Sequence, residues 1–231
     1  MNNVLRTVIL SAFFISFSAV IMAQTYRLEA GYVSRIQKGS NVSPTYLSGV
    51  RLGGTLEIPL KKFENFSLLT GALYEFVYSD KIQKYPGYTN DFEDEKLNVN
   101  YRVTSHSLNI PLRLTYTLPV NKSLKFIGFA GPNFNVGLAQ KQRVYLDGAT
   151  QEYIDKMGLN IHPGNYSLYN DNDKNELYLS RLNVQLGAGA GVQWKQFQLK
   201  AGYDWGLNDL SKRDYTTIRQ KGWYLTLSVG L

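Results

Sequence analysis

Two histidines are the side chains of this sequence best suited to acid–base catalysis, because the chain has no other histidine and no cysteine. His106 lies between Ser105 and Ser107, a spacing that could serve a hydrolase in which histidine activates a serine hydroxyl. In a β-strand, however, His106 would point to one face and both serines to the other. His162 precedes a Pro-Gly pair that is typical of a turn. We therefore predict no catalytic residues and no enzyme activity, and a lipid-modifying enzyme is the third of three functional alternatives.

Two acidic segments could bind a metal ion, since calcium prefers carboxylate ligands. The stretch from Asn170 to Glu176 has the alternate aspartates of a calcium loop. It carries Glu176 where that motif requires glycine and Leu182 where it requires a bidentate acid. The stretch from Asp91 to Glu95 is interpreted in the same way, as a solvated loop. We expect no metal and no cofactor, and the absence of cysteine argues against zinc.

The elements that carry the remaining charged residues have a hydrophobic period of two, which indicates β-strands. Apolar residues such as Trp223, Leu225 and Leu227 alternate with polar residues or glycine. The predicted strands cover approximately 26–32, 50–60, 66–78, 108–116, 124–143, 182–194, 197–205 and 223–231. The fifth is the least regular, because Ile127 and Phe129 break its alternation. The pattern predicts an all-β protein, an eight-stranded antiparallel transmembrane up-and-down β-barrel.

The apolar face is expected to meet lipid. Its partner face carries charged residues mixed with glycine, and strands of about nine to eleven residues can cross a bilayer at a tilt. A mean hydropathy of −0.25 suits such a barrel better than a helical membrane protein. A soluble sandwich or lipocalin, with the apolar face turned inward, is the alternative. Tyrosine and tryptophan at the strand ends, an even strand count and an export signal argue against it.

Connection lengths alternate between tight and long. The tight ones cover 61–65, 119–123 and 195–196, and the long ones cover 37–47, 80–100, about 144–178 and 208–221. This pattern is typical of outer-membrane barrels, with turns in the periplasm and loops outside. Both termini are then expected in the periplasm.

The first 23 residues are interpreted as a signal peptide. Arg6 is followed by an apolar and small stretch from Val8 to Met22, and Ala23 precedes the predicted mature start at Gln24. An uncleaved membrane helix is the alternative, but the stretch is shorter than the ~20 residues that a spanning helix needs. The predicted domains are the signal peptide, 1–23, and the barrel, 24–231.

The inward face is expected to hold a network of charges. A barrel of eight strands has an interior that side chains can fill, and buried charges require partners. A structural network in a packed lumen is favoured over a gated channel or proton path. Its predicted members are Arg27, Glu29, Arg51, Glu57, Glu75, Arg113, Lys125, Lys200 and Asp204.

Net charge suggests which partners the protein has. The formal charge is +7, and the basic residues are spread along the chain without a run. We expect outer-membrane lipid and lipopolysaccharide as partners and no nucleic acid.

Four segments resemble a known family: SLNIPLRLTY from Ser107 to Tyr116, AGPNFNVGL from Ala130 to Leu138, YDWGLNDL from Tyr203 to Leu210, and a final strand ending at Leu231. They are similar to the outer-membrane β-barrel domain family of small porin-family barrels that includes PorT-like proteins. The likeness spans the predicted mature chain, except that many such barrels end in an aromatic residue. The resemblance implies a location in the cell outer membrane, recognition by the barrel assembly machinery, and a possible role as an accessory subunit of a protein secretion machine.

The long loops are the expected place of function, since binding residues concentrate on loops held by a rigid scaffold. The longest connection is rich in tyrosine, asparagine and aspartate, a composition suited to recognition. Its tyrosines are Tyr145, Tyr153, Tyr166, Tyr169 and Tyr178. We predict a non-enzymatic barrel that binds ligands or protein partners through these loops; the alternative is the accessory secretion subunit.

Overall fold

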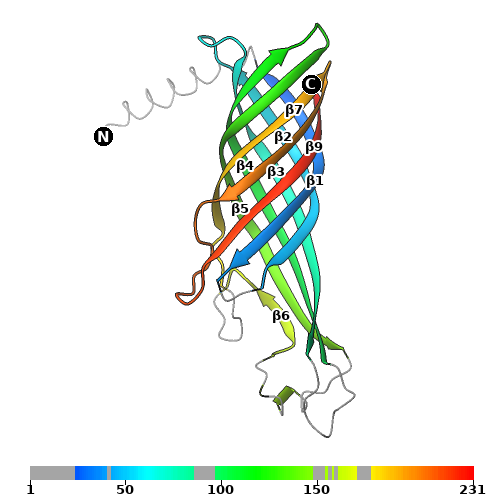
Figure 1. Cartoon of the computed structure of the whole chain (residues 1–231), viewed down its shortest axis with the longest axis vertical. Coiled ribbons are helices and arrows are strands. Elements are labelled where there is room, and N and C mark those ends of the chain that lie inside the picture. Colours follow the sequence, from blue (N-terminus) through cyan, green and yellow to red (C-terminus); the bar gives the residue numbers. More distant parts are fainter. Residues whose placement is uncertain are drawn as a thin grey trace, which may run out of the picture.

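A computed structural model describes residues 24–40, 43–85, 97–147, 154–155, 158, 161–170 and 178–231 of the chain. It contains nine β-strands (Figure 1). They are β1 (Thr25–Gly39), β2 (Thr45–Pro59), β3 (Phe66–Tyr85), β4 (Leu97–Pro119), β5 (Leu124–Asp147), β6 (Gly164–Ser167), β7 (Leu182–Trp194), β8 (Phe197–Gly206) and β9 (Ile218–Gly230). No helix in this part of the chain is long and apolar enough to cross a membrane. The predicted signal peptide, 1–23, lies outside the described residues, so cleavage before Gln24 stays a prediction.

Eight of the strands close into an antiparallel barrel, which confirms the predicted fold class. Each strand pairs with its sequence neighbour, β1 pairs with β9, and β5 pairs with both β4 and β7. The short ninth strand, β6, pairs with β5 at Lys141–Val144 and lies outside the ring. The sequence pattern did not reveal β6, because four residues are too few to show a period.

The two faces of the barrel have the polarity that the alternation predicted. Apolar side chains such as Leu28 and Leu227 are each 55% exposed on the outer wall, whereas Arg35 and Asp204 are fully buried inside. A continuous apolar outer wall of this kind is unfavourable in water and suits lipid. The soluble alternative is therefore not supported.

Aromatic pairs lie near both ends of the outer wall. Tyr32 and Trp223 have ring centroids 5.2 Å apart, toward the end where β1 meets the start of β9. Phe66 and Tyr116 lie 5.0 Å apart at the opposite end. Amphipathic rings are favoured at the two membrane interfaces, so these pairs mark the borders of the membrane-spanning band.

Tight turns and both described chain ends lie at one end of the barrel, called the turn end here (Figure 1). The turn between β7 and β8 has two residues, Lys195 and Gln196. Lys195 has a φ of 54°, which a hairpin this short requires. At the opposite loop end, β3, β4 and β5 continue beyond the other strands (Figure 1).

One long connection was predicted wrongly. The loop expected over 37–47 is reduced to residues 40–44, because β1 runs to Gly39 and β2 begins at Thr45. Gln37 and Lys38 look like loop residues by composition, but both remain in the ladder opposite Gln220 and Arg219. The strict alternation of tight and long connections therefore fails at this position.

The irregular fifth strand has a physical explanation. Ile127 and Phe129 point into the lumen, where they are buried. The register with β4 then shifts between His106 and Ser107, and Leu138 is the extra residue of this β-bulge. The bulge lies just past Val136, where the pairing of β5 with β7 ends, and before Lys141, where its pairing with β6 starts.

Candidate functional site

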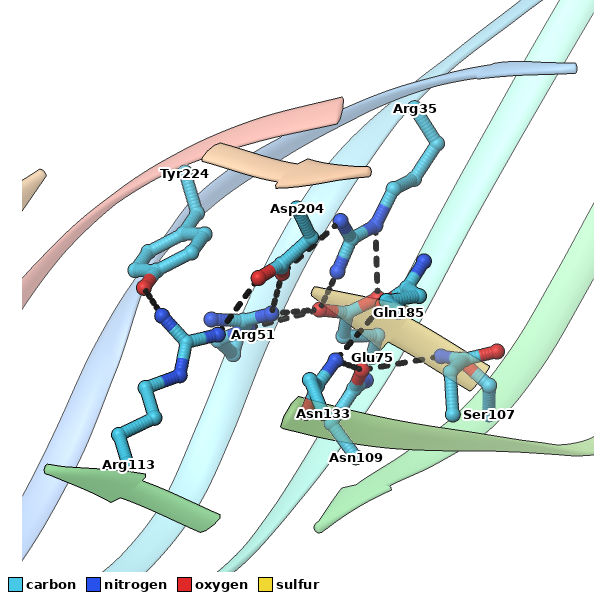
Figure 2. Close-up of polar contacts among 11 residues, drawn as sticks. Arg35, Arg51, Glu75, Ser107, Asn109, Arg113, Asn133, Gln185, Asp204 and Tyr224 are labelled. Carbon is cyan, nitrogen blue, oxygen red and sulfur yellow. Dashed lines mark hydrogen bonds and ion pairs between the residues drawn. The ribbon is translucent and has the colours of Figure 1, made fainter. Parts of the chain in front are cut away.

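A charged layer crosses the middle of the barrel interior (Figure 2). Glu75 on β3 accepts hydrogen bonds from Arg35 Nη2 and from Arg51 Nε, both at 2.7 Å. Asp204 on β8 accepts from Arg113 Nη2 at 2.6 Å and from Arg35 Nη1 at 3.3 Å. Arg35 therefore joins the two carboxylates into one network, in which every side chain is at most 3% exposed.

Aromatic rings complete the charged layer. Arg113 Nη1 donates to Tyr224 Oη at 2.5 Å, and the Arg51 guanidinium lies 4.1 Å from the centre of the Tyr224 ring. Phe129 lies beneath Arg113, with 5.3 Å between the guanidinium and the ring centre. These cation–π contacts stabilise the guanidinium groups at their buried positions.

Smaller ion pairs fill the interior toward the turn end. Lys200 Nζ lies 2.5 Å from Glu29 Oε2, and Arg27 Nε lies 3.7 Å from Glu57 Oε2. Arg27 also donates to the Gln193 side chain at 3.0 Å. Each buried charge here has an opposite charge nearby, as burial in a low dielectric requires.

Amides form the next layer toward the loop end (Figure 2). The Asn133 side chain donates to Asn109 at 3.0 Å and to Gln185 at 2.7 Å. Asn135 donates to Asn109 at 3.0 Å and to Ser107 at 2.9 Å. The layer links the neighbouring strands β4, β5 and β7 on the inner face of the wall.

A final amide group closes the lumen near the loop end. Gln140 donates to Gln37 at 3.1 Å, and Gln37 donates to Gln220 at 3.0 Å. Tyr169, from the connection after β6, donates to Gln140 at 3.4 Å. Burial raises the pKa of this Tyr169 hydroxyl above its ordinary value, so it stays protonated and able to donate.

A small cavity lies inside the barrel. It has a volume of about 20 Å³ and lies among Glu29, Arg51, Arg113 and Lys200, which is room for about one water molecule. Buried charged side chains surround this cavity, and the buried amides of Asn109 and Asn133 lie toward the loop end. The arrangement suits a structural plug.

The structure brings together most of the predicted network. Arg27, Glu29, Arg51, Glu57, Glu75, Arg113, Lys200 and Asp204 all take part in ion pairs inside the barrel. Lys125 differs, because it is half-buried near the turn end and forms no ion pair with the residues described.

Sequence reasoning missed the central arginine of the network. Arg35 has the same parity as Arg27 and Glu29 on β1, so extending the alternation past Tyr32 would have found it. It was not included because the polar residues after it look like a loop. The amides were also missed, since asparagine and glutamine on an inward face show no distinguishing signal.

The loop end contains a folded platform, defined here as β6 with the connections that pack on it and on the extended parts of β4 and β5. One apolar cluster is made of Val99, Val144, Ile154 and Ile161, with Tyr166 packed against it. A second cluster contains Leu168, Leu179, Leu210 and Ile218, with Tyr169 packed against it. The platform thus has a core of its own outside the barrel.

The loop tyrosines brace the platform and are half-buried. Tyr166 Oη donates to the His162 carbonyl oxygen at 2.7 Å. The Arg181 guanidinium lies 4.8 Å from the centre of the Tyr169 ring, and Lys212 Nζ lies 4.8 Å from that of Tyr178. Tyr145 faces Arg102 at 5.8 Å. Tyr153 and residues 86–96 and 171–177, with most of both acidic segments, lie outside the described residues.

The histidines do not form a hydrolase site in the part of the chain described. His106 lies on the outer wall, with Nδ1 2.6 Å from Tyr74 Oη and its ring 5.0 Å from that of Phe76. Ser105 and Ser107 are buried on the inner face, as the parity predicted. Within the described ranges, no group of three or more histidine, aspartate or glutamate side chains is placed to hold a metal ion.

Comparison with known proteins supports the architecture. A family model described as an outer membrane protein beta-barrel domain matches residues 15–212. No curated protein matches the chain.

Several solved structures are similar over most of their length. Ail, the attachment invasion locus protein of Yersinia pestis, is 13% identical with a TM-score of 0.38, covering 91% of this chain and 100% of that one. Neisserial surface protein A is 10% identical with a TM-score of 0.44, covering 88% and 96%. The outer membrane enzyme PagL is 12% identical with a TM-score of 0.33, covering 87% and 99%.

Proposed function

Because this chain belongs to the outer membrane protein beta-barrel domain family, we propose that it is a non-enzymatic barrel of the outer membrane that binds a ligand or protein partner through its loop-end platform. The loop end then faces the outside of the cell, as in bacterial outer-membrane barrels. The outer membrane enzyme PagL is among the similar folds, so the fold alone does not distinguish a binding protein from an enzyme.

The observation that carries the proposal is the core of the platform. Loops that merely connect strands are mobile and have few buried apolar contacts. Here Ile154 and Val99 are completely buried, and Leu168 is 1% exposed, in a region beyond the barrel wall. A folded surface on a rigid scaffold is the usual support for a binding site.

The packed interior supports binding at the surface over transport through the lumen. Arg35, Glu75 and Asp204 occupy the axis of the barrel with side chains from three strands. Breaking this network to open a path would leave buried charges without partners, at a cost of several kcal/mol. His106 is not placed as a catalytic base, because its contacts are Tyr74 and Phe76 and neither supplies a carboxylate to orient the imidazole.

The test replaces the tip of the platform and leaves the barrel intact. Val144 pairs with Gly164 in the β5–β6 hairpin, so residues 146–162 can be replaced by an Asn-Gly turn between Tyr145 and Pro163. The matched control replaces the β2–β3 turn, 61–65, by the same dipeptide at the opposite end. Cells that express each form are crosslinked intact, and the barrel is purified from the outer-membrane fraction with its bound partners.

We expect a specific partner with the original chain and with the turn control, and its loss with the platform variant. Recovery of one stoichiometric set of secretion or envelope proteins with all three forms would favour the accessory-subunit alternative. If no partner is recovered with any form, binding through the platform is contradicted.

A further inference from the structure

A depression with a volume of about 490 Å³ lies at the loop end, where β8, β9 and β1 are adjacent. Its lining includes Lys38, Arg219, Lys221 and Trp205. The volume is in the range of sites that hold small ligands or headgroups. Gln220, which also lines the depression, belongs to the amide group inside the barrel. The other four residues belong neither to the interior network nor to the platform core.

The three cations of this depression share one face of the sheet. Lys38 has the parity of Tyr32 on β1, and Arg219 and Lys221 have the parity of Trp223 on β9, so all three belong to the outer wall. Lys38 lies directly opposite Arg219 in the ladder. Like charges in direct cross-strand pairs repel, and the repulsion disappears when an anion lies between them.

No carboxylate of the described residues forms an ion pair with any of the three cations. The connection before β9 carries two acids, Asp209 and Asp214. Asp214 is exposed and is not ion-paired with any of the three cations. Asp209 Oδ1 accepts from the backbone N–H groups of Ser211 at 2.9 Å and Ile218 at 2.7 Å. The Asp209 carboxylate therefore binds the backbone at the start of β9. The depression has a positive charge with no protein partner to neutralise it.

Hydrogen bonds hold the rim of the depression in place. Ser40 N donates to the Thr217 carbonyl at 3.1 Å, and Thr217 N donates back to Ser40 Oγ at 3.1 Å. Thr216 Oγ1 donates to the Ser40 carbonyl at 2.9 Å. These bonds fix the end of β1 against the start of β9, and so keep Lys38 beside Arg219.

The depth of the depression matches that of lipid headgroups. The ring centres of Trp223 and Tyr32 lie 5.2 Å apart, and those of Trp205 and Tyr203 lie 4.8 Å apart. These aromatic pairs mark the loop-end border of the apolar band. Lys221 precedes Trp223 by two residues, about 7 Å along the strand toward the loop end, and Arg219 precedes it by four. Cations just beyond an aromatic girdle lie where lipid phosphates are located.

We propose that the depression formed by Lys38, Arg219, Lys221 and Trp205 binds the phosphate of an outer-leaflet lipid headgroup. The ammonium and guanidinium groups contact the phosphate oxygens, and the Trp205 ring lies against the apolar part below. This site is on the barrel wall and is independent of the proposed function, because it requires membrane insertion and not the platform.

The experiment titrates the barrel, in nonionic detergent micelles, with diphosphorylated lipid A and counts bound lipid by native mass spectrometry. The site variant carries Lys38→Gln, Arg219→Gln and Lys221→Gln. The control carries Lys61→Gln, Lys62→Gln and Lys122→Gln, which removes the same charge from exposed positions at the turn end. Heat-dependent gel migration verifies that each form is folded. Dephosphorylated lipid A and inorganic phosphate serve as further probes.

We expect the site variant to bind lipid A at least about tenfold more weakly than the original chain and the control, since each cation near a headgroup contributes to affinity. Equal binding by the site variant, or an equal loss in both variants, would overturn the proposal. Equal binding of the dephosphorylated lipid would also overturn it. Displacement of lipid A by inorganic phosphate at the same concentration would assign the site to free phosphate instead.

Discussion

At the scale of single residues, Asp204 is a buried carboxylate that depends on its arginine partners. It is fully buried and accepts hydrogen bonds from Arg35 and Arg113. The Arg51 guanidinium also lies 3.6 Å from this carboxylate. A carboxylate among three guanidinium groups neutralises positive charge that burial would otherwise leave uncompensated. The residue lies on β8, far in sequence from its three partners, so its role becomes visible only when the ring is closed.

Asp204→Asn should lower the free energy of unfolding by about 3 kcal/mol, because it leaves Arg35 and Arg113 buried with reduced compensation. Urea unfolding in lipid vesicles, followed by tryptophan fluorescence, measures the change. Asp80→Asn is the control: its ion pair with Arg102 is exposed, so water replaces the lost contact. Equal stability of the two variants would contradict the central role of Asp204.

Gly187 tests how tightly the charged layer is packed. A Cβ at this position would overlap the Asp204 carboxylate and would lie 2.9 Å from Arg113 Nη2. Gly187→Ala should therefore cost about 1–3 kcal/mol in the same unfolding measurement, as overpacking generally does. Gly128→Ala should be neutral, because a Cβ there meets no atom within 4 Å. A neutral Gly187→Ala would mean that the network can move aside.

The sequence was sufficient to place most inward charges, because inward and outward residues alternate along each strand. A strand that faces lipid must alternate strictly, so parity alone assigned Arg51, Glu75 and Arg113 to the interior. Parity does not say which charges meet, since that depends on the register of strands far apart in the chain. Arg35 was missed because its strand continues through Gln37 and Lys38, where composition indicates a loop and pairing with β9 determines the structure.

At the scale of the strands, the long β3–β4–β5 hairpins determine what the loop end can do. They extend past the barrel, and β6 pairs with the edge of β5 that faces away from β4. The connection after β6 folds onto the same extension. The bulge at Leu138 marks the transition from wall to platform. Arg181 Nη1 donates to the Leu138 carbonyl at 2.9 Å, which ties the start of β7 to the bulge.

Ile154→Asp should open the platform and leave the barrel intact. The new carboxylate would be buried against Val99, Val144 and Ile161, with no cation in that cluster to compensate it. Proteinase K should then cleave the connection between β5 and β6 about tenfold faster in intact vesicles, as local unfolding predicts. The heat-dependent gel shift of the barrel should persist.

Val120→Asp provides the matched control, since Val120 is 52% exposed in the β4–β5 turn. It introduces the same charge at the opposite end and should not alter cleavage of the platform. If both variants were cleaved at the same rate as the original chain, the apolar cluster would not be what holds the platform.

At the scale of the whole molecule, the barrel has a lumen filled with side chains. Its interior carries layers of ion pairs and amides with a cavity of about 20 Å³. Because side chains fill the interior of a barrel of eight strands, we expect no hydrated ion to pass through it.

The purified protein should give no conductance steps in planar lipid bilayers in 1 M salt, and sugar-loaded liposomes that contain it should not swell. Replacing Arg35, Glu75 and Asp204 together by serine removes three large side chains from the axis and is the comparison most able to create a leak. Stable channel openings in the original chain would contradict the packed lumen.

The charged layer also has a consequence for the order of assembly. Its members come from β1, β2, β3, β4, β8 and β9, so that Arg113 on β4 meets its carboxylate partner only when β8 arrives. A sheet inserted before its last strands were added would expose unpaired guanidinium groups to hydrocarbon, which is strongly unfavourable. Partly closed forms are therefore energetically unfavourable, and we expect insertion and closure to occur as one cooperative event that the final hairpin completes.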